Sequence, residues 1–329
     1  MSWYVGCASA DLRGNPLART LLDVPIVLFR AVDGKAAALL DRCAHRNIPL
    51  SEGRVVDCRL QCRYHGWQYD DFGRCVKIPG LVGDAQKESR GIPRFATVEQ
   101  DGFVWVYSVA DVDPSCKPFA LPTLERGAVE VRRVLQVQAP LQPALENFLD
   151  VPHTAVLHQG LFRGNRKPRR IKVHVSRTSN GVEAEYIGEE RPQGWAARIL
   201  LPSGGEVKHV DRFIMPSIAQ IEYRLGSDLH FVVNALCVPV EAALTRVHAV
   251  IQFRTRLPGW FVKVLLNPIA TRIFDQDASI LKSQAESLRR WGGEHYTSTT
   301  VDVLGLQIAR LLRGGDDSED WTRDIELEV

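Results

Sequence analysis

The sequence predicts an α+β protein in two parts: an antiparallel β domain over residues 1–110, then a domain over residues 111–329 in which helices flank an antiparallel sheet. Three observations support this prediction. Short apolar runs alternate with turn residues near the start of the chain, several stretches between positions 171 and 256 alternate hydrophobic and polar residues, and apolar residues at helical spacing lie on both sides of those stretches. A chain of 329 residues is long enough for two such domains, or for one large domain with an insertion.

The composition and charge of the chain exclude several classes of protein. Hydrophobic residues make up 45% and charged residues 24%, as in soluble globular proteins. A net charge of +2 gives no reason to expect a nucleic acid as partner. No uncharged apolar run approaches the roughly 18 residues that a membrane span needs, and residues 1–10 lack the pattern of a signal peptide, so we expect a cytoplasmic protein with no membrane partner. Seven cysteines, an odd number, fit metal ligation in a reducing compartment better than disulfide bonds.

The first domain is predicted to open with antiparallel strands. The apolar runs WYVGCA and PIVLFRAVDGKAAALL lie between Trp3 and Leu40, and Asp33-Gly34 in the second run is a strong hairpin signal. The strand GFVWVY at 102–107 is expected to close this domain, and the segment DVDPSCKPFALP at 111–122 to link it to the next one.

Two short loops inside the first domain carry candidate metal ligands. Each loop offers one thiolate and one imidazole, and the four ligands are Cys43, His45, Cys62 and His65. Zinc accepts two sulfur and two nitrogen ligands, and so does a Rieske [2Fe–2S] cluster, in which two histidines replace two cysteines on one iron. Four buried residues without any metal would have to explain the spacing in both loops at once, which makes that alternative weak.

The residues CAHR at 43–46 and CRYHGWQYD at 62–70 resemble the Rieske domain of ring-hydroxylating oxygenases. The resemblance implies a [2Fe–2S] cluster on the four ligands, with zinc as a minor alternative. Respiratory Rieske proteins have a disulfide cysteine and a serine where this chain has Tyr64 and Trp67, so a hydroxyl able to hydrogen-bond a cluster sulfur is missing. This predicts a potential in the lower part of the Rieske range of about −150 to +300 mV, suited to electrons from NAD(P)H. Asn47 replaces a glycine usual in the oxygenases and can adopt the left-handed conformation.

A second group of candidate ligands lies at 141–158, which is predicted to be a helix. Two histidines, His153 and His158, follow Asp150 within nine residues, and imidazole with carboxylate suits Fe(II). In a regular helix the two imidazoles would point about 140° apart, so one metal could not bind both. Pro152 supplies an irregularity, because a proline removes a backbone hydrogen bond and clashes with the carbonyl of Phe148. A kinked turn then brings the rings together; a core helix with two ordinary histidines is the alternative.

The carboxylate that completes such a site is sought on a second helix, predicted to follow Pro268 and to end at Gly292-Gly293. Asp277 shares its helical face with Ile273, Ile280 and Leu281, whereas Asp275 lies on a polar face. A charged group on an apolar face is costly unless it is paired or coordinates a metal. A buried salt bridge remains open, but two histidines that lack a carboxylate favour Asp277 as a ligand.

With these residues identified, the chain resembles Rieske non-haem iron oxygenases over nearly its whole length. The motif spans Asn147 to His158 and continues with Gln276-Asp277. The resemblance implies a helix-grip (START-like) catalytic domain in which His153, His158 and Asp277 bind a mononuclear Fe(II). It also implies that Asp150 links this iron to a cluster histidine of an adjacent subunit, within a homotrimer.

These features predict the terminal oxygenase component of an electron-transfer system. Because the chain contains no glycine-rich nucleotide fingerprint or flavin segment, we expect electrons from an NAD(P)H-dependent reductase or a ferredoxin. With O₂, the enzyme would hydroxylate or oxidatively demethylate a hydrophobic or aromatic small molecule. The alternative is a Rieske electron carrier fused to a non-catalytic domain that binds an apolar ligand, for which the second metal motif has no use.

Two further segments receive no chemical role. The basic run RGNRKPRR at 163–170 could dock an acidic redox partner, although charge runs are usually solvated loops. After a short amphipathic helix, the sequence DDSEDWTRDIELEV at 316–329 is expected to form an acidic, mobile tail.

Overall fold

The computed structural model describes residues 2–124, 127–158, 170–189, 207–226, 229–254, 258–315 and 321–328. The chain divides into two compact units, Met1–Leu121 with Pro239–Glu241, and Pro122–Val238 with Ala242–Val329, and each is described by itself. Across the described ranges, no helix has the length and apolar character to cross a membrane. Of the basic run at 163–170, all but Arg170 lies outside the described residues.

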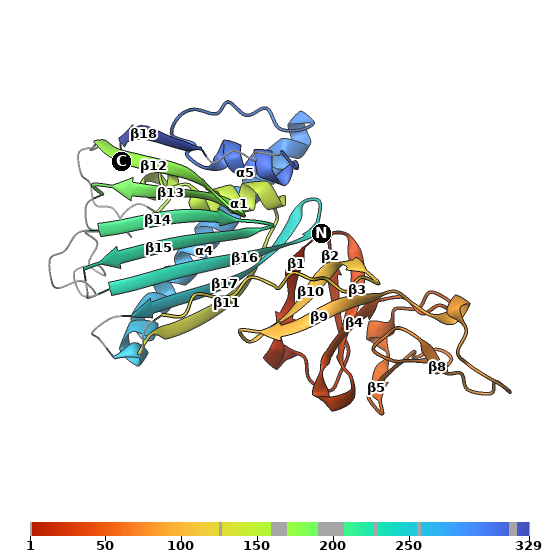
Figure 1. The fold of residues 1–329 in the computed structure, drawn as a ribbon. Coiled ribbons are helices and arrows are strands. Elements are labelled where there is room, and N and C mark those ends of the chain that lie inside the picture. The colour runs from red at the N-terminus through yellow and green to blue at the C-terminus, as the bar shows by residue number, and fades with distance from the viewer. Residues whose placement is uncertain are drawn as a thin grey trace. The chain divides into compact units, whose positions relative to one another are not determined.

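The first unit contains two antiparallel sheets (Figure 1). The six-stranded sheet has the order β1-β10-β9-β4-β3-β2, with β1 (Trp3–Ala8), β2 (Leu17–Leu21), β3 (Val24–Arg30), β4 (Ala36–Leu40), β9 (Arg94–Gln100) and β10 (Phe103–Ala110). The smaller sheet consists of β5 (Arg54–Val56), β6 (Arg59–Gln61), β7 (Gln68–Tyr69) and β8 (Cys75–Lys77). Four single 3₁₀ turns are η1 (Ser9–Asp11), η2 (Val32–Gly34), η3 (Leu50–Glu52) and η4 (Glu88–Arg90).

The hairpin predicted at Asp33-Gly34 is confirmed. β3 and β4 pair antiparallel, and the turn between them holds Asp33 at φ 59°, a conformation that aspartate tolerates better than most residues. Phe29 and Leu39 on these strands are fully buried, and they share one hydrophobic cluster with the cysteines of both ligand loops. The two thiols are therefore in the apolar interior of this unit.

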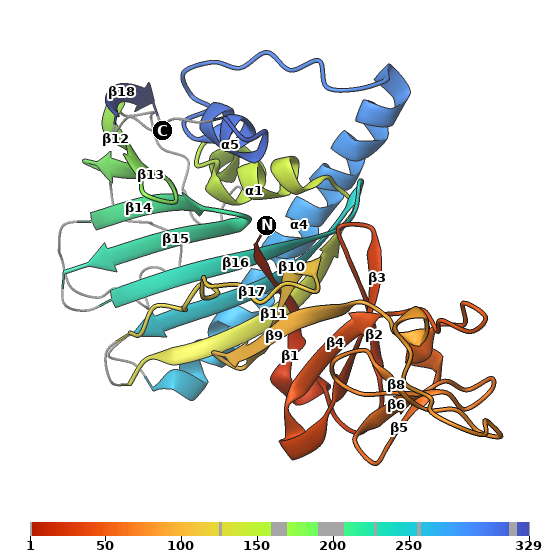
Figure 2. The ribbon, with the colours of Figure 1, turned by 45° about the vertical axis from the view of Figure 1, so that its right-hand side comes forward.

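The second unit is one antiparallel sheet with helices against it (Figures 1 and 2). The strand order is β11-β17-β16-β15-β14-β13-β12-β18, with β11 (Val129–Val137), β12 (Arg170–Thr178), β13 (Gly181–Ile187), β14 (Val207–Ile214), β15 (Ile218–Leu225), β16 (Leu229–Glu241), β17 (Leu244–Arg254) and β18 (Thr322–Glu328). The helices are α1 (Leu141–Leu149), α2 (His153–Val156), α4 (Gly259–Trp291) and α5 (Gly305–Leu312). The predicted α+β class is confirmed.

The hydrophobic core of this unit lies between the sheet and three of its helices. Leu145 of α1, Leu281 of α4 and Ile308 of α5 belong to the same buried cluster as Phe213 and Val247 of the sheet. Side chains along a strand alternate between its two faces, so this cluster identifies the helix-covered face. The helices that carry the candidate iron ligands are held by this core.

One helix boundary was predicted wrongly. α4 begins at Gly259, directly after Pro258, so Pro268 lies inside the helix instead of before it. A proline removes one backbone hydrogen bond, and a helix of 33 residues tolerates that loss because its other bonds and its buried face remain. The sequence contains two prolines ten residues apart, and only the first of them starts the helix.

The prediction of a mobile C-terminal tail was also wrong for residues 322–328. This segment forms β18, which pairs antiparallel with β12, and its Leu327 is buried. Arg170 lies opposite Glu328, and His174 lies opposite Asp324 at 2.7 Å between Nδ1 and Oδ1. The acidic composition of the segment concealed both its alternating apolar residues and its charge complementarity to β12. The short helix expected before it is confirmed as α5.

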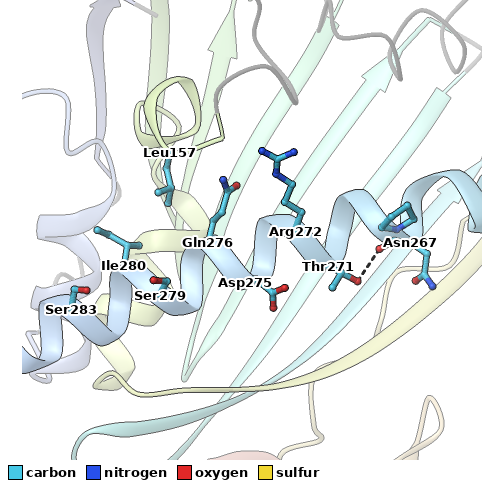
Figure 3. Close-up of a pocket in the computed structure, with 10 residues that line it drawn as sticks. Leu157, Asn267, Thr271, Arg272, Asp275, Gln276, Ser279, Ile280 and Ser283 are labelled. Carbon is cyan, nitrogen blue, oxygen red and sulfur yellow. Dashed lines mark hydrogen bonds between the residues drawn. The ribbon is translucent and has the colours of Figure 1, made fainter.

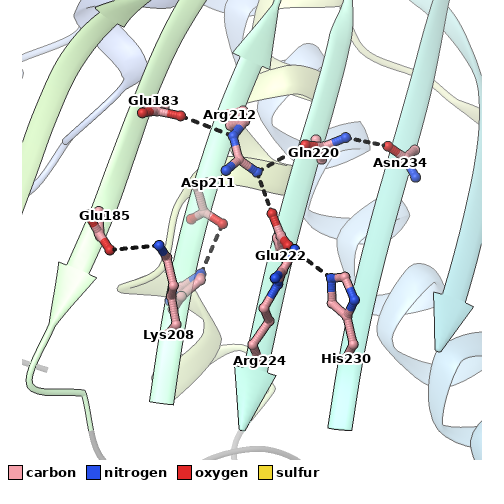
Figure 4. A network of polar contacts seen from close by, with 11 residues as sticks. Glu183, Glu185, Lys208, Asp211, Arg212, Gln220, Glu222, Arg224, His230 and Asn234 are labelled. Atoms are coloured by element: carbon pink, nitrogen blue, oxygen red, sulfur yellow. Dashed lines mark hydrogen bonds and ion pairs between the residues drawn. The ribbon is translucent and has the colours of Figure 1, made fainter. Parts of the chain in front are cut away.

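The two faces of the central strands differ in their polar groups. On the face away from the core cluster, Arg212 donates to Glu183 at 3.0 Å, to Gln220 at 3.1 Å and to Glu222 at 2.7 Å, and Figure 4 shows this ladder across β13, β14 and β15. Such a ladder ties three strands together through side chains in addition to their backbone hydrogen bonds.

The helix-covered face contains a buried charge cluster centred on His209, which the sequence did not reveal. His209 Nδ1 lies 2.6 Å from Glu189 Oε2, and its Nε2 lies 2.9 Å from Asp211 Oδ1. The imidazole is stacked between Tyr186 and Tyr223, with ring centroids 4.4 and 3.9 Å away. Burial alone would lower the pKa of His209, but the carboxylates of Asp211 and Glu189 outweigh burial and raise it to about 9. The ring is therefore a cation at neutral pH.

We expect His209→Gln to lower the free energy of unfolding by roughly 3 kcal/mol near pH 6, because two buried carboxylates lose their cation. The pKa of His209 is about 6.5 when unfolded and about 9 when folded, so its stabilisation is complete below pH 6.5 and is lost as the pH rises through about 9. Urea unfolding should show a gap between variant and wild type that is smaller at pH 10 than at pH 6. His174→Gln is the control, since that exposed ion pair should cost under about 1 kcal/mol. Equal gaps for His209→Gln at both pH values would contradict a charged His209.

Candidate metal centres

The two ligand loops of the first unit have the same backbone construction. The Cys43 N–H donates to the carbonyl of Ile48 at 2.9 Å, and the Cys62 N–H donates to the carbonyl of Trp67 at 2.8 Å. In each loop the cysteine carbonyl accepts from the residue four positions later, which is Asn47 in one and Gly66 in the other. Both of those residues are left-handed, at φ 59° and 72°. Asn47 therefore adopts the conformation that a glycine would have at this place.

The four predicted cluster ligands are brought together by these loops. Cys43 and Cys62 are buried, and the ring centroids of His45 and His65 lie 4.5 Å apart. Burial raises the pKa of the Cys62 thiol, so a thiolate here requires positive charge beside it. His45 Nδ1 is buried and has no hydrogen-bond partner. Two thiols inside an apolar cluster and a buried imidazole nitrogen without a partner fit an iron–sulfur group.

Tyr69 adds a contact to this centre that the sequence analysis missed. Its phenol oxygen lies 3.3 Å from Cys43 Sγ and accepts the N–H of Ala44 at 3.2 Å, which leaves the O–H free to donate to the sulfur. The signal was present in the motif CRYHGWQYD, four positions after His65. Position 67 thus has no hydroxyl, but Tyr69 places one beside the sulfur of one predicted ligand, Cys43.

The segment with the other two histidines differs from the kinked helix expected. α1 ends at Leu149, Asp150 is extended at φ −95° and ψ 101°, and α2 starts after Pro152. Val151 precedes a proline, which disfavours the helical conformation, while Pro152 itself suits the start of a helix. His153 and His158 thus lie on α2 and the turn after it, and α1 does not fix their direction.

The structure brings His153, His158 and Asp277 together, with one potential ligand atom from each within 4.8 Å of the others. The two Nε2 atoms are 3.3 Å apart, and Asp277 Oδ1 lies 3.6 Å from that of His153 and 3.1 Å from that of His158. Asp277 is 9% exposed, whereas Asp275 is exposed and does not join the group. The helical periodicity selected the buried acid, although Ile280, assigned to the same face, is 48% exposed.

Neighbouring groups hold these three side chains and set their charge. His153 Nδ1 contacts the carbonyl of Asp150, and the Asp150 carboxylate lies 3.6 Å from the same nitrogen. Asn147 Nδ2 donates to Asp277 Oδ1 at 3.4 Å, and His158 Nδ1 lies 2.9 Å from Gln276 Oε1.

The electrostatics of the group favour a bound cation. Burial acts to lower the pKa of His153, but Asp150 and Asp277 raise it to about 9. Burial likewise acts to raise the pKa of Asp277, which the two histidines hold below its usual value. Two imidazoles and a carboxylate that converge in a site preferring positive charge fit a mononuclear iron with open coordination positions.

The fold and both centres define a protein with a Rieske-type cluster and a separate iron domain. Residues 2–95 match the Rieske [2Fe-2S] domain, and residues 137–314, more than half of the chain, match the vanillate O-demethylase oxygenase C-terminal domain. The chain therefore belongs to the Rieske non-haem iron oxygenases. Its cofactors are a Rieske [2Fe–2S] cluster and a mononuclear iron.

Known proteins resemble the chain in sequence and in structure. Dicamba O-demethylase, oxygenase component, of Stenotrophomonas maltophilia is 36% identical over 160 residues, which are 48% of this chain and 47% of that protein. Methylxanthine N1-demethylase NdmA of Pseudomonas putida is 27% identical over 322 residues, 94% of this chain and 87% of that one. The chain spans about half the length of the first curated relatives that it matches. A crystal structure of dicamba monooxygenase bound to 3,6-dichlorosalicylic acid has the same fold, with a TM-score of 0.79 and 23% identity over 95% of this chain and 96% of that one.

We expect Tyr69→Phe to lower the midpoint potential of the cluster, because Cys43 loses the hydroxyl at 3.3 Å. The cluster itself should remain bound, since its four ligands are unchanged. A redox titration followed by electron paramagnetic resonance measures the potential. Tyr64→Phe serves as the control, because Tyr64 packs against His65 but is 63% exposed. A potential that is the same in Tyr69→Phe and wild type would show that this hydroxyl does not act on the sulfur.

Proposed function

We propose that this protein is a terminal oxygenase that uses O₂ and electrons from a partner to hydroxylate or oxidatively demethylate a hydrophobic or aromatic small molecule. The single observation that carries the proposal is the convergence of two imidazole Nε2 atoms and one buried carboxylate on one point. An apolar-ligand-binding domain fused to an electron carrier, the alternative function, has no use for that convergence. In the net reaction, one oxygen atom of O₂ is inserted into a C–H bond of the substrate, and two electrons and two protons reduce the other oxygen atom to water. Where the hydroxylated carbon is a methyl group on O or N, it then leaves as formaldehyde.

The residues divide between electron storage and the oxygen site. Cys43, His45, Cys62 and His65, in the proposed domain 1–110, hold the [2Fe–2S] cluster, which accepts one electron at a time. In the proposed domain 111–329, three ligands would bind iron(II), which supplies the one-electron chemistry that O₂ requires. His153 and His158 would bind it through their Nε2 atoms, and Asp277 would supply a negative charge.

The class of substrate is proposed from the relatives. Their names describe removal of a methyl group from oxygen in dicamba and from nitrogen in methylxanthines. Both are aromatic molecules with a methyl group on a heteroatom, so we take such compounds as first candidates here. We also propose an NAD(P)H-dependent reductase or ferredoxin as electron donor, and a cytoplasmic location, which is consistent with seven cysteines that form no disulfide bond with one another.

The working unit is proposed to be a homotrimer in which Asp150 meets a cluster histidine of a neighbouring copy. The Asp150 side chain is 42% exposed although it faces the partly buried His153, and Val156, on the same short helix as His153, is 82% exposed. In the first unit, Tyr64 and Val82 are 63% and 99% exposed. Exposed apolar side chains at both places favour burial between copies, and head-to-tail contacts of this kind close into rings.

The activity is tested with purified protein, a surrogate reductase and a panel of O-methyl and N-methyl aromatic compounds, reading substrate-dependent O₂ uptake and formaldehyde. Asp277→Asn should lose iron and turnover while the cluster spectrum persists, because the charged ligand is removed from one centre only. Asp275→Asn is the matched control, two positions away on the same helix and exposed, and should retain both. If Asp277→Asn keeps full turnover, or if the cluster is reduced but no compound supports O₂ uptake, the binding-domain alternative gains.

Asp150→Asn keeps the shape of the side chain and removes its charge. We expect both metals and the oligomer to be retained and coupled turnover to fall by 10-fold or more, on the order of the effects of groups that support a ligand. Single-turnover spectroscopy should locate the loss in slow reoxidation of the reduced cluster in the presence of substrate and O₂. Unimpaired turnover, or full activity in a monomeric protein shown by light scattering, would rule out the proposed route through Asp150.

A further inference from the structure

The two histidines of the iron site are supported by chemically different groups. His153 Nδ1 faces Asp150, through both its carbonyl and its carboxylate. His158 Nδ1 faces a neutral amide, with Gln276 Oε1 at 2.9 Å. Since Gln276 directly precedes Asp277 on α4, one helical turn presents both a ligand and the support of another ligand.

The orientation of the Gln276 amide follows from what a metal needs. A neutral imidazole has one N–H and one lone pair, and Nε2 of His158 is the atom that faces Asp277 and His153. For Nε2 to keep its lone pair for a metal, Nδ1 must carry the hydrogen, and that N–H needs an acceptor because His158 is only 2% exposed. Gln276 Oε1 is placed as that acceptor.

Gln276 occupies a place on α4 where a side chain can reach inward from the surface. It lines a groove along the exposed side of the helix, together with Leu157, Arg272, Asp275 and Ser279. Figure 3 shows the Gln276 side chain directed toward Leu157, which adjoins His158, while the Asp275 side chain points away from Leu157. The amide therefore lies between the groove and the buried His158, whereas Asp275 is exposed.

We propose that Gln276 is a positioning residue that fixes the tautomer and ring orientation of His158. This rests on the proposed oxygenase function and names the support of one ligand within that site. The amide oxygen of Gln276 would hold the hydrogen on Nδ1 and so leave the lone pair of Nε2 for the metal.

The test measures metal binding apart from turnover. Metal-free protein with its cluster intact is titrated with Co(II) in competition with a chelator, and the visible spectrum of bound Co(II) reports the coordination. Gln276→Leu should bind Co(II) about 10 to 100-fold more weakly, since it removes the amide oxygen that faces Nδ1 of His158. Gln276→Glu, which restores the acceptor, should bind at least as tightly as wild type and shift the Co(II) spectrum. Asp275→Asn, in the same groove, should match wild type.

Thermal unfolding of the metal-free variants separates positioning from packing. Gln276→Leu should unfold at the temperature of wild type, so that the loss appears only in metal affinity. Affinity in Gln276→Leu equal to wild type overturns the inference, and so does an equal loss in Gln276→Leu and Gln276→Glu. His158→Ala distinguishes this failure from a failure of the proposed function: if that variant also binds Co(II) normally, the iron site itself is misplaced, and if it alone loses Co(II), only the role of Gln276 is wrong.

Discussion

The proposed iron site depends on the break in helical structure between Leu149 and His153, because the break frees the direction of α2 from that of α1. α1 ends at Leu149, Asp150 is extended, and α2 starts after Pro152. The break also places the carbonyl and the carboxylate of Asp150 next to His153 Nδ1, where they support one proposed ligand. It precedes both histidines, and the backbone from Pro152 to Leu157 is helical, so the two Nε2 atoms come within 3.3 Å through their side chains and not through a kink between them.

Burial explains why each centre needs its surroundings. The thiols of Cys43 and Cys62 lie in a hydrophobic cluster, where a thiolate is stabilised only by a cation beside it. The proposed iron site has the opposite charge preference, because the carboxylates of Asp150 and Asp277 make a positive charge near the two histidines favourable. A third buried charge, at His209, has its counter-charges within the protein, in Glu189 and Asp211.

The sequence was informative where chemistry and spacing coincide. Four ligands in two loops identified the cluster, and periodicity separated Asp277 from Asp275, because the buried face of a long helix repeats regularly. The sequence was uninformative where a role depends on contacts between distant segments. Neither the residue type nor the spacing of Tyr69 and Gln276 indicated a contact with a proposed ligand. The fold places Tyr69 near Cys43 and Gln276 near His158. The start of α4 was misplaced because either of two prolines could begin it, and β18 was missed because acidic residues outnumber apolar ones in it.

The position of β18 in the sheet has a consequence for the order in which this unit is completed. β12 begins at Arg170, and its partner β18 ends at Glu328, so β12 can complete its pairing only after a segment about 150 residues later has been synthesised. Until then β12 would be the edge of the sheet, with Arg170 and Lys172 on it, and positive charge on an open edge discourages pairing with another copy. Once β18 pairs with β12, its acidic residues lie opposite these basic ones and β18 becomes the edge strand. The same charges thus oppose pairing of β12 with another copy and favour its pairing with β18.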